Sequence, residues 1–318
     1  MIAAYVGLAP DLAEVERHMA LALASGEPTV AALIDDLGTF HGKLLRPALL
    51  LLTARTLGQV QTSHQQLGAA LELIHTATLI HDDLIDDADT RRSKPTAHIR
   101  FGNTTAVLLG DYFYTHAFAL VAGQRNPDAM LRLVTTTNVI CRGELHQQCV
   151  ARATDTGEAE YLEVIYGKTA CLTELAAELG AIGGTPSQIA AAAAYGRACG
   201  MAFQIADDCL DFADDAEKVG KTLGTDLERG RMTLPVIRLL AKSGSRRAQL
   251  AQGLAGDASP AELADLRREI IAGGALDSAR DTARAYVRDA VEALQGLPAG
   301  GPRDQLAELA RFIVDREF

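Results

Sequence analysis

The stretch that decides the fold is residues 80–87, Ile-His-Asp-Asp-Leu-Ile-Asp-Asp, which places four carboxylates within six positions. On an α-helix of about 3.6 residues per turn, Asp82 lies one turn from Asp86, and Asp83 lies one turn from Asp87. Mg²⁺ prefers carboxylate oxygens and is usually completed by water and substrate phosphates. The motif therefore predicts a metal-bridged phosphate site on a helix, and a solvated acidic helix end is the alternative interpretation.

A second acidic triplet with the same spacing lies far along the chain. Residues 203–212 read Phe-Gln-Ile-Ala-Asp-Asp-Cys-Leu-Asp-Phe, so Asp207, Asp208 and Asp211 follow a small, apolar run. Buried or half-buried carboxylates without a counter-charge are costly, which makes a metal partner the favoured explanation. Two carboxylate clusters on two helices predict metal ions, and through them a diphosphate, held between those helices.

Composition narrows the class of protein. The chain has 318 residues, 48% of them hydrophobic, and a formal net charge of −11. This acidity argues against nucleic acid as a partner, because binding to a phosphate backbone needs a basic face. The N-terminus lacks the basic segment of a signal peptide, no apolar run approaches the ~20 residues that span a bilayer, and the cysteines lack Cys-x-x-Cys spacing. We expect a soluble, cytoplasmic protein with reduced thiols and no transmembrane segment.

Helical signals recur from end to end. Apolar residues at three- and four-residue spacing predict helices over residues 11–25, 43–57, 64–87, 105–122, 128–149, 158–179 and 187–212. Thr185-Pro186-Ser187-Gln188 and Ser259-Pro260-Ala261-Glu262 read as helix starts with an N-cap, a first-turn Pro and a capping-box partner. No alternating run of β-branched residues, repeat or low-complexity linker divides the chain. We therefore predict one all-α domain over residues 1–318.

Two cations open an early helix. In Gly-Lys-Leu-Leu-Arg-Pro, Lys43 and Arg46 lie three residues apart on one face near a helix N-terminus, where backbone N–H groups also favour anions. His75 lies two helical turns before Asp82, on the same face. These three residues are candidates for binding a diphosphate that has no metal of its own. Solvated surface cations and a packed histidine are the alternative explanations.

Further basic residues follow. Arg91 and Arg92 come soon enough after the first acidic motif to return to it, and their guanidinium groups offer two forks for two phosphates. Lys168, within Tyr-Gly-Lys-Thr, is a candidate phosphate clamp. Lys221 lies in the glycine-punctuated stretch 218–230, which reads either as a lid over the site or as an ordinary connection.

Taken together, these motifs resemble the trans-prenyl diphosphate synthase family, and most closely its medium- and long-chain bacterial polyprenyl diphosphate synthases. The resemblance covers residues 40–238 and 312–316, and it includes Gln204 beside the motifs quoted above. It implies an all-helical bundle around a central cavity, usually a homodimer. It also implies a Mg²⁺ cluster held by Asp82, Asp83 and Asp86 on one side and by Asp207, Asp208 and Asp211 on the other.

The resemblance also implies roles for the basic and polar residues. Isopentenyl diphosphate would be bound by Lys43, Arg46, His75 and Arg92, and an allylic diphosphate by Arg91, Lys168, Thr169, Gln204 and Lys221. The metal ions and Lys168 would stabilise the departing diphosphate while the allylic C–O bond ionises, which is electrostatic catalysis. The double bond of isopentenyl diphosphate would then attack the carbocation, and a proton would be lost.

Product length depends on packing. Ala77 and Thr78 lie five and four residues before Asp82, where members of the family line the tunnel for the growing product. Their small side chains imply an open tunnel and a product in the hexaprenyl to decaprenyl range. The alternatives are a geranylgeranyl or farnesyl diphosphate synthase, a terpene cyclase, and a non-catalytic subunit of a heteromeric synthase. Ser93 departs from the family, which usually has Gly after the two arginines.

Overall fold

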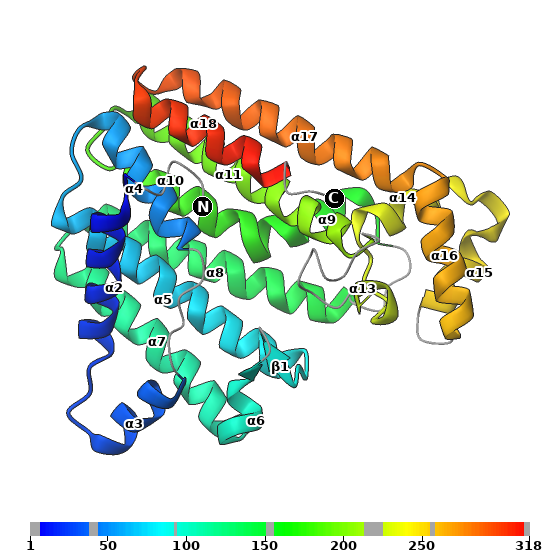
Figure 1. Ribbon diagram of the computed structural model, residues 1–318, viewed down its shortest axis with the longest axis horizontal. Coiled ribbons are helices and arrows are strands. Elements are labelled where there is room, and N and C mark those ends of the chain that lie inside the picture. Colours follow the sequence, from blue (N-terminus) through cyan, green and yellow to red (C-terminus); the bar gives the residue numbers. More distant parts are fainter. Residues whose placement is uncertain are drawn as a thin grey trace. The chain divides into compact units, whose positions relative to one another are not determined.

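The computed structural model describes residues 7–37, 44–91, 94–150, 156–212, 225–254 and 258–314. Nearly all elements in these ranges are helices, so the all-α prediction is confirmed (Figure 1). The exception is a short antiparallel hairpin of β1 (Thr90–Arg91) and β2 (Lys94–Pro95). Two residues per strand are too few to produce an alternating pattern, which is why no strand signal is visible in the sequence.

The chain divides into two compact units that alternate along the sequence. The first comprises Met1–Val134, Ala176–Ile189 and Pro298–Gln305, and the second comprises Thr135–Leu175, Ala190–Leu297 and Leu306–Phe318. Four of the five divisions fall inside helices, namely α8 (Pro127–Val150), α10 (Cys171–Gly180), α11 (Pro186–Leu210) and α18 (Gly301–Val314). One domain over residues 1–318 stays a prediction.

Helix α5 (Thr62–Ile85) organises the first unit. It packs most extensively against α7 (Asn103–Gly123), and also against α2 (Ala9–Leu23), α4 (Leu45–Leu57) and α6 (Ala97–Phe101). Figure 1 shows α5, in cyan, beside α7. Leu67, Leu71 and Ile74 of α5 are at most 2% exposed. The helix that carries the first acidic motif is therefore also the apolar centre of its unit.

A glycine allows α5 and α7 to approach closely. A Cβ atom at Gly110 would lie only 2.0 Å from Nε2 of His81, so no other residue fits there without a shift. The same Nε2 lies 3.1 Å from the carbonyl oxygen of Val107, to which it donates a hydrogen bond. His81, which directly precedes the acidic motif, is thus used to join the two helices.

Helix α7 is the one described helix that is long and apolar enough to cross a membrane by length and composition. An interior helix of a folded protein satisfies the same two criteria. Ala106, Leu109, Phe113 and Val121 of α7 are at most 4% exposed. Packing against α5 therefore accounts for part of its apolar character.

In the second unit, the segment predicted as one helix over residues 158–179 has an interruption. It consists of α9 (Glu158–Ile165), a π-helical turn η1 (Tyr166–Ala170) and α10. A π turn adds a residue to the helical repeat, which a 3.6-residue pattern does not reveal, and such turns occur frequently at functional sites. Lys168 and Thr169 both lie in this turn.

Close backbone contacts hold the π turn in place. A Cβ atom at Gly167 would lie 3.1 Å from Cα of Gly143 in α8. On the other side, a Cβ atom at Gly200 in α11 would lie 2.5 Å from Cα of Ala170. Because Gly167 and Gly200 have no side chain, the turn can lie close to both α8 and α11.

The remaining elements of the second unit are α13 (Thr225–Glu228), α14 (Leu234–Lys242), η2 (Gly244–Arg246), α15 (Arg247–Gln252), α16 (Pro260–Ala272), α17 (Ala275–Ala293) and η4 (Leu294–Gly296). Helix α14 contacts α9, α16 and α17. Arg238 of α14 donates to Glu158 Oε1 at 2.6 Å and to the Ser278 hydroxyl at 3.0 Å. This arginine fixes the start of α9 against two other helices.

Local sequence signals agree with the structure at both predicted helix starts. The Gln188 N–H donates to the Thr185 hydroxyl at 3.3 Å, and the Thr185 N–H donates to Gln188 Oε1 at 2.8 Å. Ser259 and Glu262 form the same reciprocal capping box at the start of α16. The four cysteines whose side chains are described are free thiols. Near the N-terminus, α3 (Pro28–Leu37) has no buried residue.

Candidate active site

The first acidic motif lies at the C-terminal end of α5. Asp82 and Asp86 are partly exposed, and the Asp86 N–H donates to the Asp82 carbonyl oxygen at 2.8 Å, which keeps them one turn apart. Asp87 has a φ of 50° and is not helical. The predicted stacking of Asp87 on Asp83 is therefore wrong. Several carboxylates at the negative end of a helix dipole disfavour further helical turns, which fits an end at this point.

Asp83, the middle aspartate, differs from its two neighbours in the motif. Its residue is 6% exposed, and Nε of Arg91 donates to both of its carboxylate oxygens, at 2.8 and 2.9 Å. Burial raises the pKa of Asp83, and the Arg91 guanidinium opposes that rise. Arg91 comes from β1, so the short hairpin returns this cation to the motif, as the sequence predicted.

One face of α5 leads toward the motif. His75, Thr78 and Asp82 are spaced for a common face and are all partly exposed. Ala77, by contrast, is fully buried at 0% exposure. The Thr78 hydroxyl donates to the His75 carbonyl oxygen at 2.7 Å. Of the two predicted chain-length residues, Thr78 is therefore the one on the accessible face.

The structure describes only some of the predicted binding residues for isopentenyl diphosphate and the allylic diphosphate. Arg46 lies in the first turn of α4 and is partly exposed. Leu44, just before α4, has a φ of 46°, a left-handed conformation that is uncommon for a residue with a Cβ atom and recurs at functional sites. Lys43, Arg92 and Lys221 lie outside the described residues, so their roles stay predictions.

The second acidic motif lies near the end of α11. Asp207 is partly exposed, whereas Asp208 and Asp211 are 7% and 8% exposed. Asp208 accepts two hydrogen bonds, from the Tyr161 hydroxyl at 2.6 Å and from Nε2 of Gln204 at 2.8 Å. Burial raises the pKa of Asp208 to about 7, against the lowering effect of the Tyr161 hydrogen bond.

The π turn supplies two further predicted residues to this region. The Thr169 hydroxyl donates to Oε1 of Gln204 at 2.7 Å, which joins η1 to α11. Nζ of Lys168 lies 3.3 Å from Oε2 of Glu144 and 3.4 Å from Oε1 of Gln147, both on α8. The structure therefore brings Thr169, Gln204 and Asp208 into one hydrogen-bonded group, and their roles in binding substrate and metal stay predictions.

Sequence reasoning missed three residues around the second motif. The Asp226 N–H donates to Oδ2 of Asp211 at 3.1 Å, and the Asp226 carboxylate pairs with Arg231 at 3.1 Å. Burial raises the pKa of Asp226, and Arg231 opposes the rise. Tyr161 is the third missed residue. It lies two helical turns before Lys168, a spacing that the sequence displays, but an aromatic residue in an apolar helix ordinarily indicates core packing.

The chemistry of the acidic motifs fits Mg²⁺, which prefers carboxylate oxygens. Nevertheless, in the part of the chain that the structure describes, no three His, Cys, Asp or Glu side chains are grouped to hold an ion. Asp83 and Asp208 already accept hydrogen bonds from protein donors on both oxygens. An ion at either motif would need additional oxygens from water or a ligand, a requirement that suits Mg²⁺ bound to a diphosphate.

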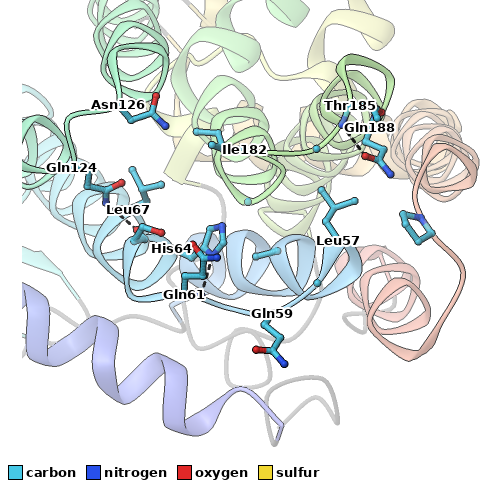
Figure 2. Close-up of a pocket in the computed structure, with 17 residues that line it drawn as sticks. Leu57, Gln59, Gln61, His64, Leu67, Gln124, Asn126, Ile182, Thr185 and Gln188 are labelled. Carbon is cyan, nitrogen blue, oxygen red and sulfur yellow. Dashed lines mark hydrogen bonds between the residues drawn. The ribbon is translucent and has the colours of Figure 1, made fainter.

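A separate pocket of about 600 Å³ lies at the opposite end of α5 (Figure 2). His64, one of its lining residues, precedes Asp82 by 18 residues, or about 27 Å along the helix axis. Much of the polar lining is already used in helix capping. For example, the Gln61 N–H donates to Nδ1 of His64 at 3.0 Å. This pocket is therefore not part of the acidic site.

An all-helical fold with two Asp-Asp-x-x-Asp motifs defines the class of isoprenoid synthases, and comparison with known proteins agrees. The sequence profile of the polyprenyl synthetase family matches residues 27–270, more than half of the chain. The chain belongs to the polyprenyl synthetase family. The resemblance predicted from the motifs is thereby confirmed, and the chain is a prenyl-transferring enzyme.

Individual relatives extend the comparison over nearly the whole chain. The octaprenyl diphosphate synthase of Haemophilus influenzae is 36% identical over 315 residues, 97% of this chain and 95% of that protein. A short chain isoprenyl diphosphate synthase of Methanothermobacter thermautotrophicus is 37% identical over 291 residues, 89% of each chain. The polyprenyl synthase of Caulobacter crescentus CB15, solved with calcium and isoprenyl diphosphate, has a TM-score of 0.91 and 36% identity, covering 98% of this chain and 96% of that one.

Proposed function

We propose that this protein is a Mg²⁺-dependent prenyltransferase of isoprenoid biosynthesis. It condenses isopentenyl diphosphate with an allylic diphosphate to form an all-trans polyprenyl diphosphate in the hexaprenyl to decaprenyl range. The observation that carries the proposal is the form of the two acidic motifs in a member of this family. Each motif presents a partly exposed first aspartate beside a buried middle aspartate that protein donors hold.

The outer aspartates are the proposed metal ligands. Asp82, Asp86 and Asp207 are partly exposed, and Asp211, which accepts from the Asp226 N–H at 3.1 Å, is the fourth proposed ligand. When bound, Mg²⁺ would supply positive charge that stabilises the leaving diphosphate. Asp83 and Asp208 would contribute by fixing the ends of their helices. Calcium with isoprenyl diphosphate in the Caulobacter crescentus structure supports the use of a divalent ion in this fold.

The chain's own cations have proposed positions in the reaction. Arg91 contacts Asp83 through Nε alone, which leaves its terminal nitrogens for the allylic diphosphate. Glu144 and Gln147 hold Nζ of Lys168 on the side of α8, where it would take part in neutralising the same diphosphate. Lys43, Arg46, His75 and Arg92 are proposed to bind isopentenyl diphosphate. No side-chain nucleophile is needed, because the attacking group is the double bond of that substrate.

Product length is proposed to depend on the accessible face of α5. Thr78 lies on the same face as Asp82 and carries a small side chain, so a growing tail can pass it. The Haemophilus influenzae relative supports a long product, whereas the Methanothermobacter relative keeps a geranylgeranyl or farnesyl product as the alternative. A terpene cyclase is less well supported, because the second motif is Asp-Asp-x-x-Asp. A non-catalytic subunit is also less well supported, because the sequence keeps the charged residues that the resemblance implies.

Thr78→Phe tests this placement. We expect the product to shorten by several isoprene units, because a ring at an accessible position obstructs the path of the tail. Ala77→Phe should instead destabilise the fold by about 1–3 kcal/mol, since Ala77 is fully buried and a much larger side chain overpacks a buried position. Chain-length analysis and urea unfolding measure the two effects. An unchanged product from Thr78→Phe would show that this face does not carry the tail.

The proposed assembly is a cytoplasmic homodimer. Val107 and Leu108 of α7 are 42% and 62% exposed, and Leu131 and Val134 of α8 are 66% and 45% exposed. A contiguous patch of large exposed apolar side chains is typical of protein interfaces, and these four residues are proposed to form part of one. We expect a dimer in sedimentation, and a monomer for Leu108→Asp combined with Leu131→Asp. A monomeric natural protein would contradict the homodimer.

The experiment that tests the function is product analysis. The purified protein is incubated with Mg²⁺, labelled isopentenyl diphosphate and farnesyl diphosphate, and the dephosphorylated products are separated by length. We expect a series ending well beyond geranylgeranyl. A series that stops at geranylgeranyl would replace the long product by the short-chain alternative. Absence of condensation with every allylic primer would contradict the proposed reaction.

A further inference from the structure

We propose that Tyr161 is a positioning residue of this reaction, acting through Asp208 and Gln204 on the groups that bind the allylic diphosphate. The inference rests on the proposed function and adds a residue to it. Tyr161 lies on α9 and is 4% exposed, so the substrate does not reach its ring. Its effect on the reaction must therefore pass through the residues that its hydroxyl contacts.

A chain of three hydrogen bonds makes the connection. The Tyr161 hydroxyl donates to Oδ2 of Asp208 at 2.6 Å, and Nε2 of Gln204 donates to Oδ1 of the same carboxylate at 2.8 Å. The Thr169 hydroxyl donates to Oε1 of Gln204 at 2.7 Å. These hydrogen bonds thus connect three elements of the second unit, from α9 to α11 and from α11 to the π turn.

The direction of these bonds fixes which atoms remain for a ligand. The ionised carboxylate of Asp208 only accepts, so in that state Gln204 turns its amide nitrogen toward Asp208 and its oxygen toward Thr169. The Thr169 hydroxyl then donates its hydrogen bond to Gln204. One N–H of Gln204 remains, and it is a donor suited to a phosphate oxygen. Without the Tyr161 hydroxyl, Oδ2 of Asp208 loses its donor, and the carboxylate can rotate and release Gln204 from this orientation.

Tyr161 is itself firmly held. It packs in the apolar core with Ile205 and Cys209, and the start of its helix is tied to α14 through Glu158 and Arg238 at 2.6 Å. Burial, followed by the nearby Asp208 charge, raises the pKa of Tyr161 well above its usual value. The hydroxyl therefore remains a donor throughout the physiological pH range.

Tyr161→Phe removes the hydroxyl alone. We expect KM for the allylic diphosphate to rise about tenfold, the cost of losing one hydrogen bond to a charged group, with KM for isopentenyl diphosphate unchanged. Tyr195→Phe is the matched control, because Tyr195 is also fully buried, and its hydroxyl donates to the Leu306 carbonyl oxygen at 2.7 Å, away from the chain of bonds. KM does not depend on the folded fraction, so partial unfolding does not imitate this result.

A double-mutant cycle tests the route through Asp208. Binding of an allylic thiolodiphosphate, which resists ionisation, is measured with Mg²⁺ by calorimetry so that inactive variants remain measurable. Tyr161→Phe should weaken binding about tenfold in the natural chain but less than about twofold when Asp208 is already Ala. Equal weakening in both backgrounds, or equal KM changes in Tyr161→Phe and Tyr195→Phe, would overturn the inference. Failure of the natural protein to condense its substrates would instead reject the proposed function.

Discussion

The two acidic motifs have the same spacing, yet their middle aspartates have different hydrogen-bond partners. Asp83 and Asp208 are almost equally buried, at 6% and 7% exposure. Asp83 receives both of its hydrogen bonds from a cation, Arg91, which a short hairpin returns to the end of α5. Asp208 accepts its two hydrogen bonds from neutral donors, the Tyr161 hydroxyl and the Gln204 amide.

The difference shows that a motif determines where the carboxylates lie, whereas the neighbouring residues determine how far the charge of each carboxylate is compensated. An arginine compensates a buried carboxylate directly, whereas hydroxyl and amide groups offset only part of its desolvation. The pKa of Asp208 therefore rises to about 7. Without metal, the second motif carries a middle carboxyl group that is partly protonated at neutral pH.

The largest effect should come from the outer aspartates. We expect Asp82→Ala and Asp207→Ala each to reduce kcat at least about 10³-fold, because each removes a proposed ligand of the metal that stabilises the leaving diphosphate. Helix content by circular dichroism serves as the control for folding. Near-normal turnover in either variant would break the proposed equivalence of the two motifs as metal sites.

The next effect is the contribution of Asp208 to the pH dependence of stability. Its folded pKa of about 7 lies above the unfolded value of about 3.9, so between these values the folded protein binds more protons. Stability of the metal-free protein should therefore fall as pH rises from 5 to 7, by at most about 1.4 kcal/mol per pH unit from this group.

The comparison with Asp208→Asn isolates that contribution, because other titrating groups are common to both proteins. Thermal unfolding at several pH values should give a flatter profile for the variant. Parallel profiles for the natural protein and Asp208→Asn would contradict the raised pKa.

A smaller difference should separate neutral replacements of the two middle aspartates at pH 8. Asp83→Asn removes the charge opposite Arg91 and should cost about 0.5–1 kcal/mol, a modest figure because the Arg91 side chain is 41% exposed. Asp208→Asn removes a charge that its site disfavours, and the Tyr161 hydroxyl can rotate to accept from the new amide. It should be neutral or stabilising. Urea unfolding decides the order, and the reverse order would contradict the assigned charge balance.

Features that depend on interactions between nearby residues could be predicted from the sequence, whereas features that depend on contacts between distant residues could not. Helical periodicity and capping boxes are local, so the all-α fold and the start of α11 at Thr185 were predictable. The return of Arg91 to the acidic motif was also predictable, because few residues separate them. Tyr161 was not, since its contact with Asp208 spans 47 residues and depends on a π turn that the 3.6-residue pattern conceals. Likewise, only packing distinguishes Ala77 from Thr78.

The most direct test of the account is the Mg²⁺ concentration that gives half-maximal rate in four variants, Asp82→Asn, Asp83→Asn, Asp207→Asn and Asp208→Asn. We expect an increase of about 100-fold or more for the two outer positions, which lose a metal ligand. For the two middle positions, which lose only a supporting contact, the increase should not exceed about tenfold. An increase at Asp83 or Asp208 as large as that at its outer neighbour would contradict the division between ligands and supports.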